Sequence, residues 1–116
     1  MSQGFSTVSD DTALNQRILE LGDALRQRGW HVSCAESCTG GGIAFAFTSV
    51  SGSSDWFNQS WVTYSNDAKH QQLGVNESTL AEHGAVSEQT VAEMVSGVIN
   101  NTSANVGISV SGIAGP

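Results

Sequence analysis

The chain has 116 residues and a formal net charge of −7 at pH 7, from 4 Lys and Arg against 11 Asp and Glu. That length is typical of one domain, and a hydrophobic content of 39% is enough to bury a modest core without disulfides or a metal. The acidic balance argues against a DNA or RNA surface, which needs several basic side chains, and against attraction to an anionic membrane. One small phosphorylated ligand stays possible, because backbone N–H groups bind phosphate without net positive charge.

The chain has no run of about 18 apolar residues, and its first residues lack the basic start and apolar centre of a signal peptide. We therefore expect a cytoplasmic protein with no membrane partner. The two cysteines, Cys34 and Cys38, fall in a predicted strand and in the turn after it, beyond the roughly 7 Å reach of a disulfide. No Cys and His cluster has zinc spacing, so the residues predict no zinc site.

The first half of the chain predicts a helix, a buried strand and a second helix. Residues 1–11 are polar and aperiodic and predict a flexible tail, before one domain over residues 12–116. A helix is expected from Thr12 to Gly29, capped by Asp10 or Asp11. Residues 30–35 predict a short buried strand, and residues 43–50 an apolar helix after a Gly-rich turn. The residues expected to form the buried stripe of the first helix are Leu14, Ile18, Leu21 and Leu25.

The second half continues the alternation of strands and helices. Residues 51–54 predict a turn, residues 59–64 a strand, and residues 66–73 and 77–83 two short helices. Ser87 is expected to cap a longer amphipathic helix, and residues 106–110 form a β-branched strand. This order predicts an α/β fold, in which ligands bind beyond the carboxyl ends of the strands.

Ser37 lies between the first predicted strand and the Gly-rich turn, where the N–H groups of Thr39, Gly40 and Gly41 would point outward. Such N–H groups stabilise a phosphate or the oxyanion of an acyl-transfer intermediate, and a nucleophilic hydroxyl belongs beside them. Serine is also a favoured helix cap, so both interpretations stay open at this point. The turn is not a P-loop, because no lysine follows the glycines.

Lys69 is the only lysine in the chain, and Tyr64 is the only tyrosine. A partly desolvated lysine can act as a general base toward a serine hydroxyl, and a tyrosine hydroxyl can donate a proton. The alternatives are a solvated lysine and a half-buried core tyrosine. Glu36 either orients the loop or a ligand, or is a solvated turn residue. Structural or surface roles are expected for His31, His70 and His83.

Four motifs in a fixed order carry a family resemblance. They are AESCTGG at residues 35–41, VTYSN at 62–66 with Lys69 after it, HGAVS at 83–87 and SVSGIAGP at 109–116. In this order they resemble the CinA C-terminal domain family, the competence-damage-inducible protein family, whose members include nicotinamide-nucleotide amidohydrolases. The resemblance extends from about Leu14 to Pro116.

The resemblance implies a three-layer α/β/α sandwich. It also implies hydrolysis of the carboxamide of nicotinamide mononucleotide to nicotinate mononucleotide and ammonia, a salvage reaction without a metal or other cofactor. Ser37 is implied as the nucleophile, Lys69 as the base that activates it and Tyr64 as a supporting proton donor. The residues implied to hold the oxyanion or the nucleotide are Glu36, Cys38, Thr39, Gly40, Gly41, Ser109, Ser111 and Gly112.

Domains of this family continue beyond the GIAGP motif through a further strand and a closing helix. We therefore expect the chain to lack the C-terminal elements of the sandwich, and to be a form without the molybdopterin-binding-like domain of longer CinA proteins. Uncovered sheet edges and apolar faces recruit other chains, so we expect a homo-oligomer or a lost segment. The alternative function is a catalytically incomplete member that binds a nucleotide or completes an oligomer. A generic nucleotide-binding module is disfavoured, because neither a dinucleotide nor a P-loop fingerprint is present.

Overall fold

The computed structural model describes residues 11–112. Each predicted helix and strand is present, with boundaries shifted by no more than about two residues, and a short 3-10 helix replaces the turn predicted at residues 51–54. The predicted flexible tail lies outside the described residues, apart from Asp11. The elements in chain order are α2 (Thr12–Arg28), β1 (Val32–Glu36), α3 (Gly42–Thr48), η1 (Ser53–Asp55), β2 (Phe57–Val62), α4 (Asn66–Leu73), α5 (Glu77–His83), α6 (Glu88–Asn101) and β3 (Val106–Val110).

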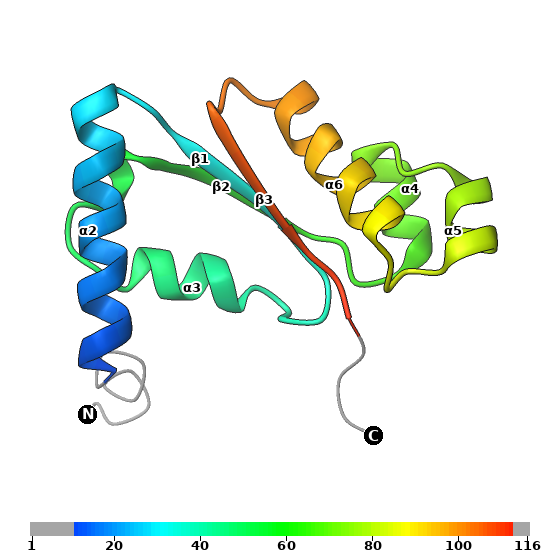
Figure 1. Cartoon of the computed structure of the whole chain (residues 1–116), viewed down its shortest axis with the longest axis horizontal. Helices are drawn as coiled ribbons and strands as arrows, with labels where there is room; N and C mark the ends of the chain where they lie inside the picture. Colours follow the sequence, from blue (N-terminus) through cyan, green and yellow to red (C-terminus); the bar gives the residue numbers. More distant parts are fainter. Residues whose placement is uncertain (1–10, 113–116) are drawn as a thin grey trace.

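The three strands form one parallel sheet in the order β2-β1-β3. Helices α2 and α3 lie on one side of the sheet and α4, α5 and α6 on the other (Figure 1). The expected α/β fold with three α/β/α layers is therefore confirmed for the described residues. Because all strands point the same way, their carboxyl ends meet at one edge, where Glu36 lies in register with Val62 and Val110.

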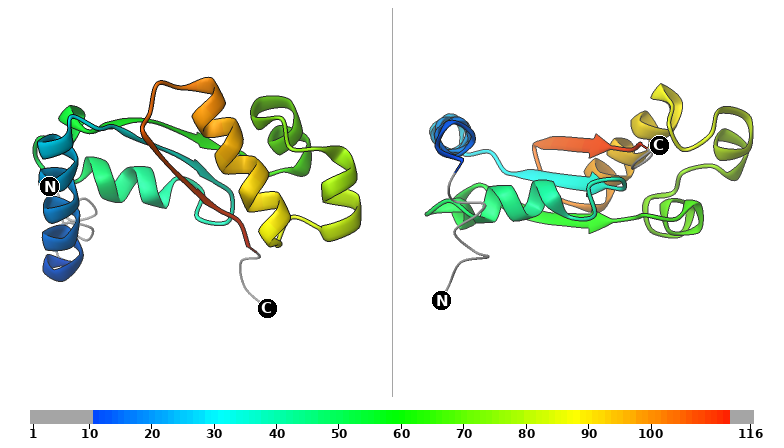
Figure 2. Two further views of the ribbon diagram at one scale, coloured as in Figure 1. Left: turned by 45° about the horizontal axis from the view of Figure 1, so that its top comes forward. Right: turned by 90° about the horizontal axis from the view of Figure 1, so that it is seen from below.

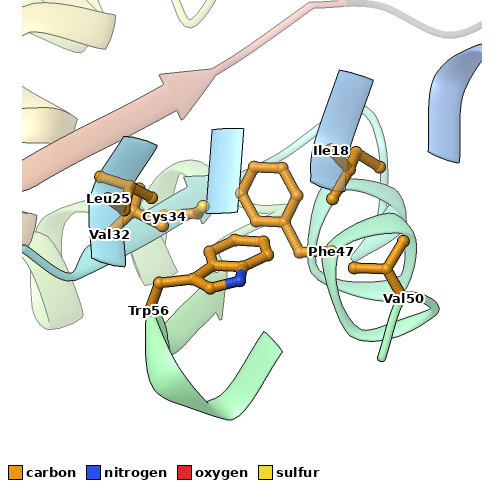
Figure 3. Close-up of a cluster of buried hydrophobic side chains, with 7 residues drawn as sticks. All are labelled: Ile18, Leu25, Val32, Cys34, Phe47, Val50 and Trp56. Carbon is orange, nitrogen blue, oxygen red and sulfur yellow. The ribbon is translucent and has the colours of Figure 1, made fainter. Parts of the chain in front are cut away.

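Side chains of β1 alternate between the two faces of the sheet, as in any strand. Val32 and Cys34 enter the core under α2 and α3, where the rings of Phe47 and Trp56 meet edge to face with centroids 5.3 Å apart (Figure 3). Ala35 enters the second core, whose other fully enclosed side chains are Leu73, Val75, Met94 and Val98. The two cores fix β1 from both sides, so the residue that follows it starts from a rigid strand end.

Helix α2 begins and ends as the sequence predicts, but its buried stripe is narrower than expected. The Asp11 carboxylate accepts a hydrogen bond from the Leu14 N–H at 2.9 Å, and Gly29 ends the helix with φ of 67°. Ile18 and Leu25 are buried, whereas Leu14 and Leu21 are 42% and 37% exposed. The prediction that all four residues are buried is wrong, because α2 packs near the edge of the layer, beside α3 and η1 (Figure 2).

An apolar hollow of about 320 Å³ lies between α2 and β3, lined in part by Leu21, Trp30 and Ile108. Within residues 11–112, β3 pairs with β1 alone, so its other edge carries no strand. This agrees with the expected uncovered edge and apolar face. The expected association with another chain stays a prediction.

Candidate active site

Ser37 directly follows β1 and is only 3% exposed. Its N–H donates to the Val110 carbonyl at 3.1 Å, so the backbone pairing of β1 with β3 continues to this residue. By strand alternation its side chain leaves the sheet on the face opposite that of Glu36, toward α4. The strand end thus presents the hydroxyl in one fixed direction.

Lys69, in the middle of α4, is 1% exposed, so the alternative of a solvated lysine is wrong. The Ser65 hydroxyl caps this helix by accepting a hydrogen bond from the Ala68 N–H at 3.0 Å. The Lys69 Nζ lies 3.0 Å from the Ser37 Oγ and donates to the carbonyl oxygens of Thr63 and Tyr64, both also at 3.0 Å. The segment that joins β2 to α4 therefore surrounds the amine with main-chain acceptors.

These three contacts suit a lysine that exchanges a proton with serine. A neutral amine has two N–H groups and one lone pair. With the two N–H groups held by the Thr63 and Tyr64 carbonyls, the lone pair is left for the Ser37 hydroxyl. Burial lowers the pKa of Lys69, and the smaller opposing effect is an electrostatic contribution from the nearby Cys38. A lowered pKa increases the neutral fraction near neutral pH.

Tyr64 joins the site through its main chain. Its carbonyl oxygen accepts a hydrogen bond from the Lys69 Nζ at 3.0 Å. It also lies 3.3 Å from the Ser37 Oγ and accepts the hydroxyl proton when that proton is not directed at the amine. Its side chain is 67% exposed, and the phenolic hydroxyl makes no hydrogen bond to the described residues. The role of that hydroxyl as a proton donor stays a prediction, and the alternative of a half-buried core tyrosine is wrong.

The loop after Ser37 provides main-chain donors. Gly40 and Gly41 have φ of 60° and 105°, a region that side chains disfavour, so the tight turn depends on glycine here. The Gly40 N–H donates to the Ser37 carbonyl at 3.1 Å and is already used. Within residues 11–112, the N–H groups of Cys38, Thr39 and Gly41 have no hydrogen-bond acceptor. These three N–H groups, rather than that of Gly40, are the ones available to an oxyanion.

Glu36 is fully buried, so the alternative of a solvated turn residue is wrong. Its carboxylate accepts four hydrogen bonds, two of them from the Ile43 and Ala44 N–H groups at the start of α3, at 2.7 and 2.9 Å. The other two come from the hydroxyls of Thr39 at 2.6 Å and Ser60 at 3.2 Å. Burial on its own would raise the pKa of Glu36, but these hydrogen bonds outweigh it and lower the pKa. The N–H groups at the start of α3 are thus hydrogen-bonded to the protein's own carboxylate.

The loop after β3 lies against the loop after β1. A Cβ added at Gly112 would come within 3.2 Å of the Cys38 Sγ, so the backbone at Gly112 packs closely against the Cys38 side chain. The Ser109 hydroxyl donates to the Val91 carbonyl of α6 at 2.7 Å, which leaves it engaged with the protein. The Ser111 Oγ is buried and has no partner among the described residues. Ile113 to Pro116, the end of the last motif, lie outside the described residues.

Residues 11–112 contain no group of three or more His, Cys, Asp or Glu side chains placed to hold a metal ion. Among the helices of the same residues, none is both long and apolar enough to cross a membrane.

The thiols of Cys34 and Cys38 are both free. Burial raises the pKa of the Cys34 thiol to about 12, and the charge of Glu36 contributes further.

Residues 14–116 match the family described as the CinA C-terminal domain. The chain belongs to this family. It is 59% identical over 103 residues to the nicotinamide-nucleotide amidohydrolase PncC of Enterobacter agglomerans, covering 89% of this chain and 63% of that protein. It is 52% identical over 106 residues to the protein of the same name from Escherichia coli K12, covering 91% of this chain and 64% of that protein. The chain thus spans slightly less than two thirds of the length of these relatives.

Solved structures of CinA proteins share the fold. The crystal structure of the competence damage-inducible protein A from Klebsiella pneumoniae superposes with a TM-score of 0.86 at 42% identity, covering 89% of this chain and 64% of that one. The competence/damage inducible protein CihA from Agrobacterium tumefaciens gives the same TM-score at 44% identity, covering 89% and 62%. The family resemblance and the fold class are both confirmed.

Sequence reasoning missed two features of this CinA domain. The Thr63 and Tyr64 carbonyls that hold Lys69 are main-chain groups, which every residue carries, so no residue type signals them. The four-donor environment of Glu36 depends on Ser60, 24 positions away along the chain, and becomes visible only when β2 pairs with β1.

Proposed function

We propose that this chain carries the reactive centre of an amidohydrolase that acts on the carboxamide of nicotinamide mononucleotide. The products are nicotinate mononucleotide and ammonia. The observation that carries the proposal is the buried contact of 3.0 Å between the Lys69 Nζ and the Ser37 Oγ. The names of the relatives, which are nicotinamide-nucleotide amidohydrolases, support the substrate class.

In the first half of the proposed reaction, neutral Lys69 takes the proton of the Ser37 hydroxyl while Oγ attacks the carboxamide carbon. The tetrahedral intermediate carries its negative charge on the former carbonyl oxygen, and the free N–H groups of Cys38, Thr39 and Gly41 are the proposed donors to it. Lys69 then returns the proton to the nitrogen, ammonia leaves, and Ser37 carries a nicotinoyl ester whose ring nitrogen still bears the ribose phosphate of the nucleotide. Serine and lysine together supply both the nucleophile and the proton transfer.

In the second half, a water molecule attacks the ester carbon with Lys69 as general base. The bond from Ser37 Oγ to the carbonyl carbon breaks, Oγ recovers its proton, and nicotinate mononucleotide leaves with its new carboxylate. The sum is amide plus water giving acid plus ammonia, with no redox step. The Thr63 and Tyr64 carbonyls keep the amine oriented in both halves.

Ammonia release from nicotinamide mononucleotide tests the proposal. Ser37→Ala is expected to lower turnover by several orders of magnitude, because loss of an acyl-transfer nucleophile typically does so. Ser54→Ala is the matched control, because Ser54 is an exposed serine of η1 on the α2 and α3 side of the sheet. Mass spectrometry of a quenched reaction should also find the nicotinoyl ester on the wild type and not on Ser37→Ala.

Two results would contradict this function. A Ser37→Ala protein that keeps more than about a tenth of wild-type turnover, with its fold intact, removes Ser37 as nucleophile. A correctly folded wild-type chain that binds the nucleotide and releases no ammonia favours the catalytically incomplete module instead.

A further inference from the structure

Glu36 connects the Ser37 loop to α3 and to β2. Its carboxylate holds the Thr39 hydroxyl in that loop, two N–H groups at the start of α3 and the Ser60 hydroxyl of β2. Its own carbonyl accepts the Thr63 N–H at 2.9 Å, next to the carbonyls that hold Lys69. One side chain therefore ties both ends of the loop to the sheet.

The carboxylate oxygens of Glu36 have no room for a ligand. Each accepts two hydrogen bonds from protein donors, and the residue is 0% exposed. Glu36 therefore does not contact a substrate, contrary to its implied place among the substrate-binding residues. The loop runs from Ser37, whose N–H donates to the Val110 carbonyl, to Ile43, whose N–H donates to Glu36. Between them lie the N–H groups of Cys38, Thr39 and Gly41, which are the free donors of the loop.

We propose that Glu36 is a positioning residue, whose carboxylate holds the loop after Ser37 in the one arrangement that presents its free N–H groups to the reacting oxygen. The proposal rests on the proposed function for its catalytic consequence. Preorganised donors are effective only when their positions are fixed, since a displacement of about 1 Å near the chemistry can cost about 100-fold in rate. The loop contains Gly40 and Gly41, so its own backbone supplies little stiffness.

The decisive variant is Glu36→Gln, which keeps the shape and removes one acceptor. Whichever way the amide is oriented, its NH₂ group faces the N–H of Ile43 or of Ala44, and a backbone N–H cannot turn to accept. The matched control is Glu93→Gln. The Glu93 carboxylate likewise accepts hydrogen bonds from a backbone N–H, that of Asn76 at 2.8 Å, and from the Thr79 hydroxyl at 2.7 Å. Both donors belong to the start of α5 and not to the Ser37 loop.

Two measurements are made on the wild type and both variants. Amide hydrogen exchange should show faster exchange at Ile43 and Ala44 in Glu36→Gln and unchanged exchange there in Glu93→Gln. With nicotinamide mononucleotide, Glu36→Gln should lower kcat by about tenfold to 100-fold, because the loop donors act in the transition state, and leave KM within about threefold. Glu93→Gln should leave kcat within about twofold of the wild type.

A milder pair of variants covers the case in which Glu36→Gln fails to fold. Thr39→Val removes one of the four donors and should lower kcat, and Thr39→Ser should restore it, since only the hydroxyl contacts Glu36. For Glu36→Gln, unchanged hydrogen exchange at Ile43 and Ala44, or a loss of kcat no larger than in Glu93→Gln, overturns the proposal. A kcat of Thr39→Val equal to that of the wild type also overturns it. If the wild type releases no ammonia, the proposed function fails, and hydrogen exchange still decides whether Glu36 holds the loop.

Discussion

Gly97 of α6 lies where the backbone of α4 comes closest, and Gly97→Ala is expected to disturb both stability and the position of Lys69. A Cβ at this position would overlap the Leu73 carbonyl oxygen and lie 2.9 Å from the carbonyl carbon, whereas ordinary contacts begin at 3.4 Å. The end of α4 would have to retreat by about half an ångström or more. A backbone carbonyl cannot rotate away as a flexible side chain can.

The expected net cost of Gly97→Ala follows from two opposing effects. Overpacking of this kind costs about 1–3 kcal/mol, and replacing glycine by alanine within a helix returns about 1 kcal/mol. Because the overlap is with a backbone carbonyl, the cost lies at the upper end of that range, and we expect the free energy of unfolding to fall by about 2 kcal/mol, measured by urea denaturation. Gly42→Ala is the control, because its Cβ would lie 3.6 Å from the nearest side-chain atom, in Thr39, which is an ordinary contact. Without an overlap, this variant should be as stable as the wild type or more stable by up to about 1 kcal/mol.

The activity of Gly97→Ala is a second test of the same contact. Because α4 carries Lys69 four residues before Leu73, a shift of its last turn should lengthen the contact from the amine to Ser37 and lower kcat by roughly tenfold. A Gly97→Ala protein as stable and as active as the wild type would show that the two helices are not in the close contact described, and would refute this reasoning.

Three further variants test the role of the Lys69 amine. Since burial lowers the pKa of Lys69, kcat/KM should rise with pH through an apparent pKa below the roughly 10.4 of a free lysine. Lys69→Arg stays protonated and should lose this rise. An unchanged pH profile in Lys69→Arg would show that Lys69 is not the base. The unfolded chain binds more protons than the folded one between the lowered and the ordinary pKa, so the free energy of unfolding should increase with pH over that window, and Lys69→Met should flatten this increase in denaturation curves. Tyr64→Phe keeps the carbonyl that holds Lys69, so the apparent pKa of the kcat/KM profile should stay at its wild-type value, and a shifted profile would show that the hydroxyl acts on the amine.

The fold was largely predictable from the sequence because its signals are local. The Asp11 cap, Gly29 and the apolar spacing bound α2, and the β-branched run at residues 106–110 marks β3. The error at Leu14 and Leu21 has a physical reason, since periodicity shows which residues share a helix face but not how much of that face a neighbouring element covers. Coverage depends on the arrangement of whole elements.

The candidate site was predictable only in part. Ser37 and Lys69 were named because a serine after a strand and a solitary lysine are visible in the sequence, but their contact joins positions 32 residues apart. Their residue types alone gave each of them a plausible structural or surface role. What distinguishes the two interpretations is burial, and burial of a lysine requires acceptors that the sequence does not display.

The placement of charge explains how a buried lysine keeps a lowered pKa. Within residues 11–112, Lys69 makes no ion pair, and its three hydrogen-bond partners are all uncharged. A carboxylate beside the amine would stabilise the ammonium form and raise its pKa, which would remove the base. Glu36 is adjacent to Ser37 in sequence, yet strand alternation sends it to the opposite face, where four donors hold it. The sheet therefore lies between the Glu36 carboxylate and the Lys69 amine, so that the carboxylate can hold the loop without raising the pKa of the base.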